Sequence, residues 1–399
     1  MLQGIKVVSL THYLQGPSCV QYLADLGADV VKIEKVGGAY ERHWSGLESY
    51  VGDQSVFYLL AGRNQKSVEL NLRDQRGKEV LWKLIDEADV LVQNFRPGSL
   101  ERLGFSYEEV SKRNPGIIYC SLSGYGPVGP LAKNPGQDLL IQSISGLMNL
   151  TGTAESGPTP VGTAIVDQHG ATLGALGILA ALFRREREGK GCSVDVSLLS
   201  AALNLQLEPL SYHLNGAPLY PRSENHLGSR FHQAPYGAYP TSDGWVTISL
   251  SASDDLADAL GIEELRGVSR EEQFQDRERI SALVAERVKQ ETTEHWLRML
   301  PEHGVWSAPV GDFDDVVADE QVAANKSFVE VELHDGQQAR LVAHPIIYDG
   351  EVPGVRHTPP LSGENTKTTL SALGYDNSEI EDLLESGVIG AYSPDSSGQ

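Results

Sequence analysis

The sequence predicts an α/β protein of two domains, and three observations lead to this fold class. Short apolar runs alternate with helical segments through the first third of the chain. A loop-like segment at residues 215–235 then separates this region from a part with hairpin-like turns. Finally, 399 residues are more than one small core usually organises, so two domains are expected.

The large domain, residues 1–214, opens with an extended run at 5–10, a helical stretch ending near Gly27 and a second extended run at 29–34. Strand, helix, strand is the start of a parallel sheet. The alternation continues with extended runs at 67–72, 89–95 and 117–123 and helices at 77–88, 99–103 and 107–113. Such a series predicts a doubly wound, Rossmann-like sheet with helices on both faces.

The smaller α+β domain, residues 236–330, follows the linker at 215–235. Residues 236–240 and 245–250 flank an Asp243-Gly244 turn, which is typical of a hairpin, and charged amphipathic helices follow. A return hairpin and linker at 331–344 is centred on Asp335-Gly336, and residues 370–384 are helical again.

The composition excludes several classes of partner. A formal charge of −22 disfavours binding to nucleic acid or anionic membranes, which requires basic patches. The cysteines Cys19, Cys120 and Cys192 are isolated among apolar residues, as expected of free thiols in a reducing compartment. No secretory signal pattern precedes the first strand, and the apolar stretch 171–183 is too short to span a bilayer. We therefore expect a cytoplasmic protein.

The common cofactor motifs are missing. The turn after the first strand, residues 11–17, is not G-x-G-x-x-G, so NAD is not expected. The histidines and cysteines have no metal-ligand spacing, and no G-x-S-x-G elbow is present. We therefore expect no metal and no permanently bound cofactor.

Asp167 is a lone carboxylate at the start of a long, nearly uncharged helical segment, residues 166–182. A carboxylate at a helix start is favoured by unpaired N–H groups and by the helix dipole, so it should remain ionised. A helix with so little polar surface must be largely buried. Local sequence alone leaves two interpretations open for Asp167, a structural N-cap or a reactive group.

Loops after two predicted strands are candidate ligand sites. Residues 121–130 are rich in Gly and Pro, and residues 94–98 carry Arg96, with Arg73 and Arg102 nearby in the sequence. In open parallel sheets ligands bind beyond the carboxyl ends of the strands, and arginines there could meet phosphates. A tight turn and solvated surface charges are the alternative interpretation.

Several long motifs, in order along essentially the whole chain, resemble the class III coenzyme A transferases. This CaiB/BaiF family includes formyl-CoA transferase and the carnitine CoA-transferases and is related to α-methylacyl-CoA racemase. The matching segments are residues 4–10, 26–35, 88–98, 103–105, 123–130, 145–152, 189–191, 359–366 and 373–375.

The resemblance implies an enzyme that moves CoA between a donor acyl-CoA and an acceptor carboxylic acid. Asp167 occupies the position of the catalytic aspartate, which carries aspartyl anhydride and aspartyl-CoA thioester intermediates. CoA would lie on the large domain, which residues 345–399 would complete. The subunit would form an interlocked homodimer. The matching CoA-contact positions are Tyr13, Lys35, Arg73, Asn94, Phe95 and Arg102.

Gln137 departs from the racemase pattern, in which a His-Asp pair stands where this chain has Gln137-Asp138. Because glutamine neither gives nor takes a proton at neutral pH, two-base racemisation is disfavoured. Gln137 and backbone N–H groups of the glycine-rich loops are instead candidate donors to the oxyanion. An α-methylacyl-CoA racemase or epimerase and a non-catalytic CoA-binding protein remain the alternatives.

The acids themselves are not named by the sequence. The segment 226–235 lacks the glycine-rich loop of formyl-CoA transferase, which argues against formate and oxalate. Cationic and polar side chains in and near this segment would suit a second carboxylate on the acyl group, so dicarboxylic acids are the first candidates. These side chains are Arg222, His226, Arg230 and His232. An exposed linker would have the same composition.

Overall fold

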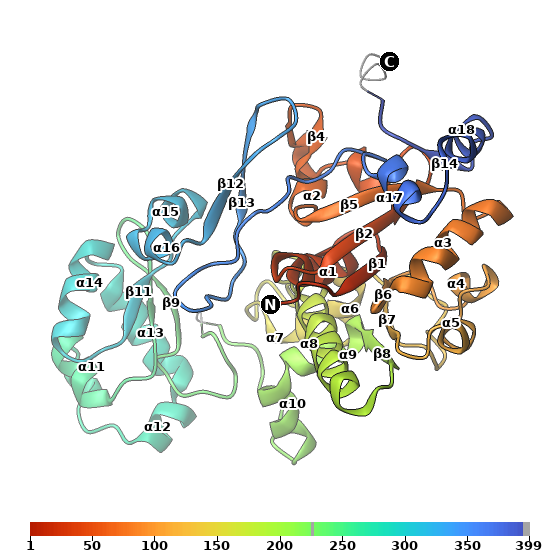
Figure 1. Cartoon of the computed structure of the whole chain (residues 1–399). Coiled ribbons are helices and arrows are strands. Elements are labelled where there is room, and N and C mark those ends of the chain that lie inside the picture. The colour runs from red at the N-terminus through yellow and green to blue at the C-terminus, as the bar shows by residue number, and fades with distance from the viewer. Residues whose placement is uncertain (225–226, 394–399) are drawn as a thin grey trace. The chain divides into compact units, whose positions relative to one another are not determined.

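The computed structural model describes residues 1–224 and 227–393, which fold as two compact units (Figure 1). Unit 1 contains Met1–Ile141, Ala164–Leu205 and the described chain from Ala323 onwards, and unit 2 contains Gln142–Thr163 and Gln206–Val322. The division differs from the predicted boundaries. Residues 142–163 group with the smaller unit, and the return hairpin belongs to the larger one.

Unit 1 is built on a seven-stranded sheet in the order β14-β5-β2-β1-β6-β7-β8. Six strands pair in parallel and the edge strand β14 is antiparallel. The strands are β1 (Lys6–Leu10), β2 (Asp29–Glu34), β5 (Gln65–Leu70), β6 (Val90–Gln93), β7 (Ile118–Ser123), β8 (Cys192–Ser197) and β14 (Ile389–Gly390). The chain begins in the middle of the sheet at β1 and winds outward in one direction and then the other, so the strand order reverses between β1 and β6.

Helices cover both faces of this sheet because neighbouring residues in each strand point to opposite sides. Val8 of β1 packs in one core with α3 and α18, whereas Val7 packs in the other with α1 and α8. The helices in or entering unit 1 are α1 (Gln15–Asp25), α2 (Val56–Leu59), α3 (Gln75–Glu87), α4 (Ser99–Arg102), α5 (Tyr107–Arg113), α6 (Asp138–Ile144), α8 (Ile165–Glu188), α9 (Leu198–Leu205), α17 (Thr366–Ala372) and α18 (Asn377–Glu385).

The longest of these helices, α8, has 24 residues and is long and apolar enough by length and composition to cross a membrane. For a membrane span, the sequence prediction considered only the apolar stretch 171–183, whereas the helix runs from Ile165 to Glu188. One face of α8 nevertheless contributes Ala171, Ala175 and Ile178 to the core beneath the sheet, as the core helix of a globular protein does.

Two hairpins accompany the sheet in unit 1. The predicted return hairpin is confirmed as β12 (Phe328–Glu332) and β13 (Gln338–Val342), and it buries Val331 and Leu341 against α2. A shorter hairpin joins β3 (Tyr50–Val51) to β4 (Gln54–Ser55).

Unit 2 is an α+β fold around the fully buried Trp296, whose indole N–H donates to the carbonyl of Val288 at 2.7 Å. The predicted hairpin is confirmed by the antiparallel pairing of β9 and β10, to which β11 adds a third strand. The strands are β9 (Gly237–Pro240), β10 (Trp245–Ile248) and β11 (Ser307–Pro309). The helices are α7 (Leu147–Leu150), α10 (Leu207–Leu214), α11 (Ser253–Leu260), α12 (Arg270–Gln275), α13 (Arg277–Val288), α14 (Thr293–Glu302), α15 (Phe313–Ala318) and α16 (Glu320–Ala324), the last of which spans the boundary between the units.

Candidate functional site

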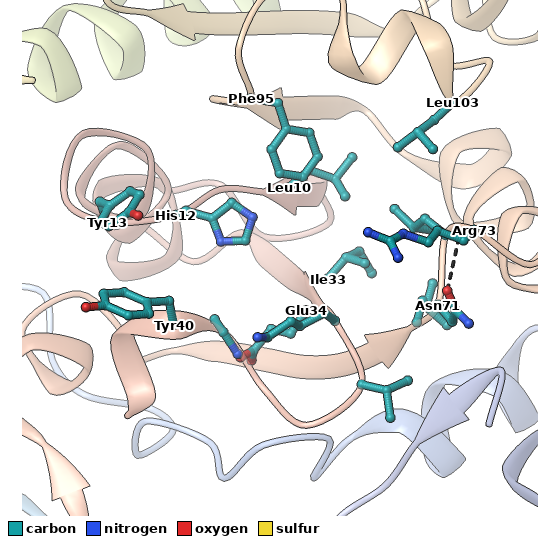
Figure 2. Close-up of a pocket in the computed structure, with 15 residues that line it drawn as sticks. Leu10, His12, Tyr13, Ile33, Glu34, Tyr40, Asn71, Arg73, Phe95 and Leu103 are labelled. Atoms are coloured by element: carbon teal, nitrogen blue, oxygen red, sulfur yellow. Dashed lines mark hydrogen bonds between the residues drawn. The ribbon is translucent and has the colours of Figure 1, made fainter. Parts of the chain in front are cut away.

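A pocket of about 710 Å³ opens at the carboxyl ends of β5, β2, β1 and β6. Of the two candidate ligand loops, residues 94–98 contribute Phe95 to its lining, whereas residues 121–130 do not line it. The pocket lies beside the point at which the strand order reverses, the usual ligand position in open α/β sheets. Figure 2 shows Tyr13 and Tyr40 at one end of the pocket and Arg73 at the other, with Phe95 between them on one wall. The volume is in the range of small-molecule sites.

The pocket carries two cations without counter-ions. Lys35 and Arg73 line it, and neither forms an ion pair within residues 1–224 and 227–393. The formal charge of −22 repels anions from the protein as a whole, whereas these two cations attract anions to the pocket. Tyr13 stands at the rim with a left-handed backbone (φ 61°) and a side chain that is 60% exposed. The pocket therefore suits an elongated anion with an aromatic or apolar portion.

The pocket brings together four of the six predicted CoA-contact residues, namely Tyr13, Lys35, Arg73 and Phe95. The other two are not among its lining residues. Asn94 instead clamps the backbone of His12, accepting from its N–H and donating to its carbonyl oxygen, both at 2.8 Å. Arg102 donates to the hydroxyl of Ser99 at 3.0 Å.

His12 was not predicted, and it forms part of the pocket wall. Its ring stacks on Phe95 with centroids 5.2 Å apart. Burial lowers the pKa of His12 below its ordinary value, although the nearby Glu41 acts in the opposite direction. The imidazole is therefore neutral at pH 7 and contributes a polar but uncharged surface.

Asp167 is the third residue of α8 and not its N-cap. The N-cap is Ala164, and no side chain of the cap residue binds the helix start. Of the two interpretations that the sequence left open for Asp167, the structural N-cap is therefore wrong. The carboxylate of Asp138 takes that role, with Oδ2 accepting from the backbone N–H of Val166 at 2.7 Å and of Asp167 at 3.0 Å.

Asp138 also changes the protonation of Asp167. Burial, and then the negative charge of Asp138, raise the pKa of Asp167 to about 7. The expectation of a permanently ionised carboxylate is corrected, because Asp138 already satisfies the N–H groups that would have stabilised Asp167 as an anion. A carboxyl group with a pKa near neutrality is more basic than an ordinary aspartate and is typical of a reacting group.

Gln137, the second predicted catalytic residue, is exposed and directly precedes α6, where its carbonyl oxygen accepts from the N–H of Ile141. The backbone of the glycine-rich loop at residues 121–130 lies against the backbone just before α6. A Cβ on Gly124 would lie 2.6 Å from the Cα of Gly136. Only glycines allow this contact, so the loop fixes the start of α6 and with it Asp138. Asp138 could have been identified from its position beside Gln137, but sequence alone does not show that it points at α8.

Unit 2 holds a separate cationic cluster. Arg222 and Arg230 both donate to Asn149, the first to its side-chain oxygen and the second to its backbone oxygen. The Nε of Arg222 is buried without a hydrogen-bond partner among the described residues, and no described carboxylate pairs with either guanidinium. Burial and the charge of Arg222 lower the pKa of Arg230.

Of the two histidines predicted to accompany these arginines, His232 lies 3.2 Å from Glu208. His226 lies outside the described residues. The arginine pair is therefore the part of the predicted cluster that offers positive charge to a ligand.

No group of three or more His, Cys, Asp or Glu in the described ranges is arranged to hold a metal ion. The side chains described above offer a basic carboxylate, a pocket with unpaired cations and a second cationic pair.

Comparison with known proteins gives one consistent result. Residues 2–366 match the model of CoA-transferase family III. The chain is 32% identical to human succinyl-CoA:glutarate CoA-transferase, covering 97% of this chain and 90% of that protein. It is 34% identical to acetyl-CoA:oxalate CoA-transferase of Acetobacter aceti, covering 82% and 85%. The crystal structure of a CaiB/BaiF family protein from Brucella suis superposes with a TM-score of 0.81 at 30% identity, covering 93% and 99%.

Proposed function

The chain belongs to CoA-transferase family III, and we propose that it is an acyl-CoA:carboxylate CoA-transferase with Asp167 as its nucleophile. The observation that carries the proposal is the single basic carboxylate at the start of α8, whose pKa is raised to about 7. The acyl-CoA and the acids are substrates, and the proposed chemistry needs no ATP and no metal because one thioester is exchanged for another.

The proposed reaction has four balanced steps. An Asp167 oxygen attacks the donor thioester carbon, and the C–S bond breaks to give an aspartyl anhydride and CoA thiolate. The thiolate attacks the aspartyl carbonyl, which releases the donor acid and leaves an aspartyl-CoA thioester. The acceptor carboxylate attacks that thioester and releases thiolate again. Attack of the thiolate on the acceptor acyl group regenerates the Asp167 carboxylate.

Hydroxylamine tests this reaction directly, since it converts an aspartyl anhydride or thioester into a hydroxamate. Incubation of the enzyme with an acyl-CoA and hydroxylamine should label Asp167, as read by peptide mass spectrometry. Asp167→Asn should bind CoA without transferring it. A wild-type protein that binds CoA tightly but is not labelled would instead support the non-catalytic alternative. Incorporation of solvent deuterium at the α-carbon of the acyl group, without an acceptor acid, would support the racemase.

For the CoA site, we propose the pocket of unit 1, with Lys35 and Arg73 binding phosphate groups and Tyr13 and Phe95 contacting the rest of the molecule. Arg73→Ala should raise KM for acyl-CoA about tenfold and leave kcat nearly unchanged, as loss of one exposed charged contact does. An equal fall in kcat at saturating acyl-CoA would contradict a role in binding alone.

We also propose that at least one exchanged acid is a dicarboxylic acid, whose free carboxylate is bound by Arg222 and Arg230. One support is that neither arginine pairs with a described carboxylate, because both donate to Asn149. The other is that relatives of this chain are named for glutarate and oxalate. A screen of mono- and dicarboxylic acceptors of equal chain length should favour the dicarboxylates by tenfold or more in kcat/KM. Arg230→Gln should remove this preference while transfer to monocarboxylates persists.

Finally, we propose an interlocked homodimer in the cytoplasm. Support for self-association is a row of exposed apolar side chains on α8, including Leu176 and Phe183. Support for a reducing location is the burial of the free thiols Cys19 and Cys120.

A further inference from the structure

The loop that carries Lys35 begins directly after β2 and turns on two glycines. Gly37 and Gly38 both have left-handed backbones, with φ of 88° and 83°. The N–H of Gly38 donates to the carbonyl of Lys35 at 2.9 Å, which closes the turn. Because glycine adopts many backbone conformations, the position of Lys35 depends on the groups that hold this turn from outside.

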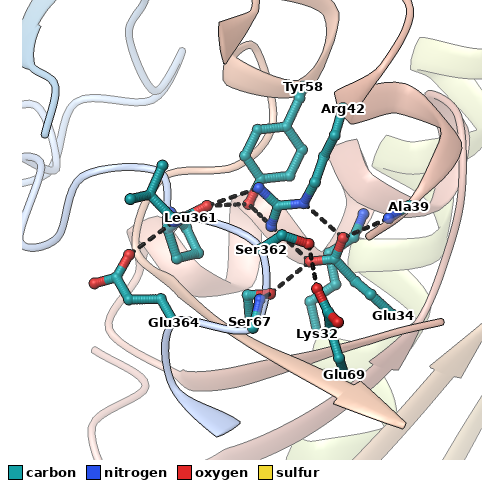
Figure 3. Close-up of polar contacts among 12 residues, drawn as sticks. Lys32, Glu34, Ala39, Arg42, Tyr58, Ser67, Glu69, Leu361, Ser362 and Glu364 are labelled. Atoms are coloured by element: carbon teal, nitrogen blue, oxygen red, sulfur yellow. Dashed lines mark hydrogen bonds and ion pairs between the residues drawn. The ribbon is translucent and has the colours of Figure 1, made fainter. Parts of the chain in front are cut away.

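Two buried carboxylates hold the turn (Figure 3). Glu34, at the end of β2, accepts from the N–H of Ala39 at 2.8 Å. Glu69 of β5 accepts from the N–H of Gly37 at 2.9 Å through Oε2 and from the hydroxyl of Ser362 at 2.6 Å through Oε1. The Glu69 residue is only 5% exposed. Its carboxylate therefore joins the turn to the C-terminal part of unit 1.

The edge strand β14 lies directly against this carboxylate. It pairs with β5 in an antiparallel register that places Gly390 opposite Glu69. A Cβ on Gly390 would lie 1.9 Å from Oε2 of Glu69, the oxygen that accepts from Gly37. A side chain at residue 390 must therefore displace the carboxylate, and this displacement breaks the hydrogen bond to the turn.

The backbone of β14 is itself anchored on both sides of Gly390. The N–H of Asn71 donates to the carbonyl of Val388 at 2.8 Å, and the N–H of Tyr392 donates to the carbonyl of Gly363 at 3.2 Å. The two residues before Gly390 are buried in the core of unit 1. A methyl group on Gly390 would consequently move the flexible carboxylate and not the strand.

The turn determines where the ammonium group of Lys35 stands in the pocket. Lys35 and its neighbour Val36 line the pocket, and Gly37 is the next residue. A turn that is released from Glu69 can adopt more conformations, and binding of a phosphate by Lys35 must then order it again. The hydrogen bond to Gly37 thus prepares the pocket for an anion before the anion binds.

We propose that Glu69 is a positioning residue for CoA, and that β14 sets the affinity for CoA through it. The inference rests on the proposed function, because it requires CoA to bind in the pocket of unit 1. Glu69 is not among the lining residues of the pocket, so its effect reaches the ligand through Gly37 and Lys35. By linkage, bound CoA should in turn hold β14 more firmly on β5.

Gly390→Ala tests the proposal at little risk to folding. Gly390 has no left-handed backbone, and the atom nearest to the added methyl group is the end of a side chain. KM for acyl-CoA, and Kd for CoA in calorimetry, should rise about tenfold, the size of one charged contact, while kcat stays within about twofold. In the matched control Gly354→Ala nothing lies within 4 Å of the added methyl group, so both constants should be unchanged.

Two substitutions of Glu69 separate positioning from packing. Glu69→Met removes both acceptor oxygens at a similar volume and should reproduce the rise in KM. Glu69→Gln keeps one oxygen for Gly37 and can donate its amide to the Ser362 hydroxyl, so KM should return to within about twofold of the wild type. A structural role alone would lower Tm in these variants without raising KM at constant kcat.

A double variant tests whether Lys35 carries the effect. Lys35→Ala combined with Gly390→Ala should have the KM of Lys35→Ala alone, because both changes act on one contact. Hydrogen exchange read by mass spectrometry tests the reciprocal effect. Saturating CoA should slow exchange at residues 388–392 in the wild type and much less in Glu69→Met. Additive rises in KM, or equal protection in both proteins, would overturn the inference.

The outcomes distinguish this inference from the function beneath it. If Lys35→Ala leaves KM for acyl-CoA unchanged, the proposed CoA site fails and the inference fails with it. If Lys35→Ala raises KM but Gly390→Ala and Glu69→Met do not, the inference fails alone. A rise in KM shared by Gly354→Ala would mean that the C-terminal part of unit 1 is weakened in general, which also overturns the inference.

Discussion

At the scale of single residues, the protonation of Asp167 sets the pH dependence of the proposed reaction. Only the carboxylate form is a nucleophile, and its pKa is raised to about 7 by burial and by Asp138. We expect kcat to rise about tenfold per pH unit below 7 and to level off above it. The measurement is kcat between pH 5.5 and 8.5 with substrates that do not titrate in this range.

Asp138→Asn provides the control for this profile. The amide oxygen of asparagine can still accept from the N–H groups of Val166 and Asp167, but the repulsive charge is gone. The acid limb of the profile should therefore move to lower pH, toward the ordinary range of an aspartate. An acid limb that stays in place would show that burial alone determines the pKa of Asp167.

The same raised pKa means that Asp167 lowers the free energy of unfolding when it is ionised. Its pKa is higher in the folded protein than in the unfolded chain, so the folded state holds more protons between about pH 4 and pH 7. The contribution of Asp167 is therefore most favourable below pH 4 and is lost as the pH rises through 7. Asp167→Asn should gain roughly 1–2 kcal/mol at pH 8, after allowance for partial exposure, and nothing at pH 4. Urea unfolding at both pH values measures this, and an equal effect at both would contradict it.

At the scale of elements, the contact between α1 and α8 predicts a small effect of Gly170→Ala on stability. The three atoms nearest to the added methyl group all belong to the Gln15 side chain, whose flexible end can move aside. We expect thermal denaturation to show a change in Tm of no more than a few degrees, and a loss of more than about 10 °C would contradict this.

A second element, the loop after β2, is fixed by a buried polar network that includes the motif at residues 359–366 (Figure 3). The Glu34 carboxylate accepts two hydrogen bonds from Arg42, both at 2.6 Å, and one from Ser67 at 2.7 Å. The guanidinium of Arg42 stacks on the Tyr58 ring at 3.8 Å and donates to the carbonyl of Pro360. The network thereby joins the C-terminal part of unit 1 to the loop that carries Lys35.

Removal of Arg42 should consequently be costly. Burial alone would raise the pKa of Glu34, but Arg42 lowers it to about 2. Because this pKa lies below that of the unfolded chain, the stabilisation is present above about pH 4.5 and is lost as the pH falls toward 2. Arg42→Met leaves a buried carboxylate unpaired and should cost about 3–5 kcal/mol at pH 7. Chemical denaturation at pH 7 checks this, and Lys66→Met, which breaks the exposed pair with Asp29, should cost under about 1 kcal/mol.

The elements also show what sequence can and cannot predict. Apolar runs flanked by turn residues located β1, β2, β6 and β7 closely, because buried parallel strands are nearly continuous in apolar character. The strand β8 was missed because its residues alternate, with Ser193 and Asp195 exposed, as an edge strand allows. In the candidate site, resemblance indicated Asp167, but the hydrogen bonds between Asp138 and the start of α8 depend on packing between segments distant in the sequence. No local pattern reports such contacts.

At the scale of the whole molecule, the distribution of charge and apolar surface predicts how the chain behaves in solution. The formal charge of −22 opposes non-specific association. Against this, α8 keeps Leu176 and Phe183 about 60% exposed, on the side of the helix opposite to the stripe that packs on α1. Large side chains at helical spacing on an otherwise apolar helix are typical of an interface. These residues are therefore our candidates for the surface covered by a second copy of the chain.

Light scattering coupled to size-exclusion chromatography should accordingly give twice the 43.3 kDa chain mass at micromolar concentration. Leu176→Glu with Phe183→Glu should shift the protein toward the monomer mass or prevent its accumulation in soluble form, because two charges would be buried without partners. Leu47→Glu, at an exposed leucine remote in sequence from α8, is the matched control and should leave the mass unchanged. A wild-type protein that remains at the single-chain mass, with full transferase activity, would remove the homodimer and leave the apolar face of α8 without the role assigned to it.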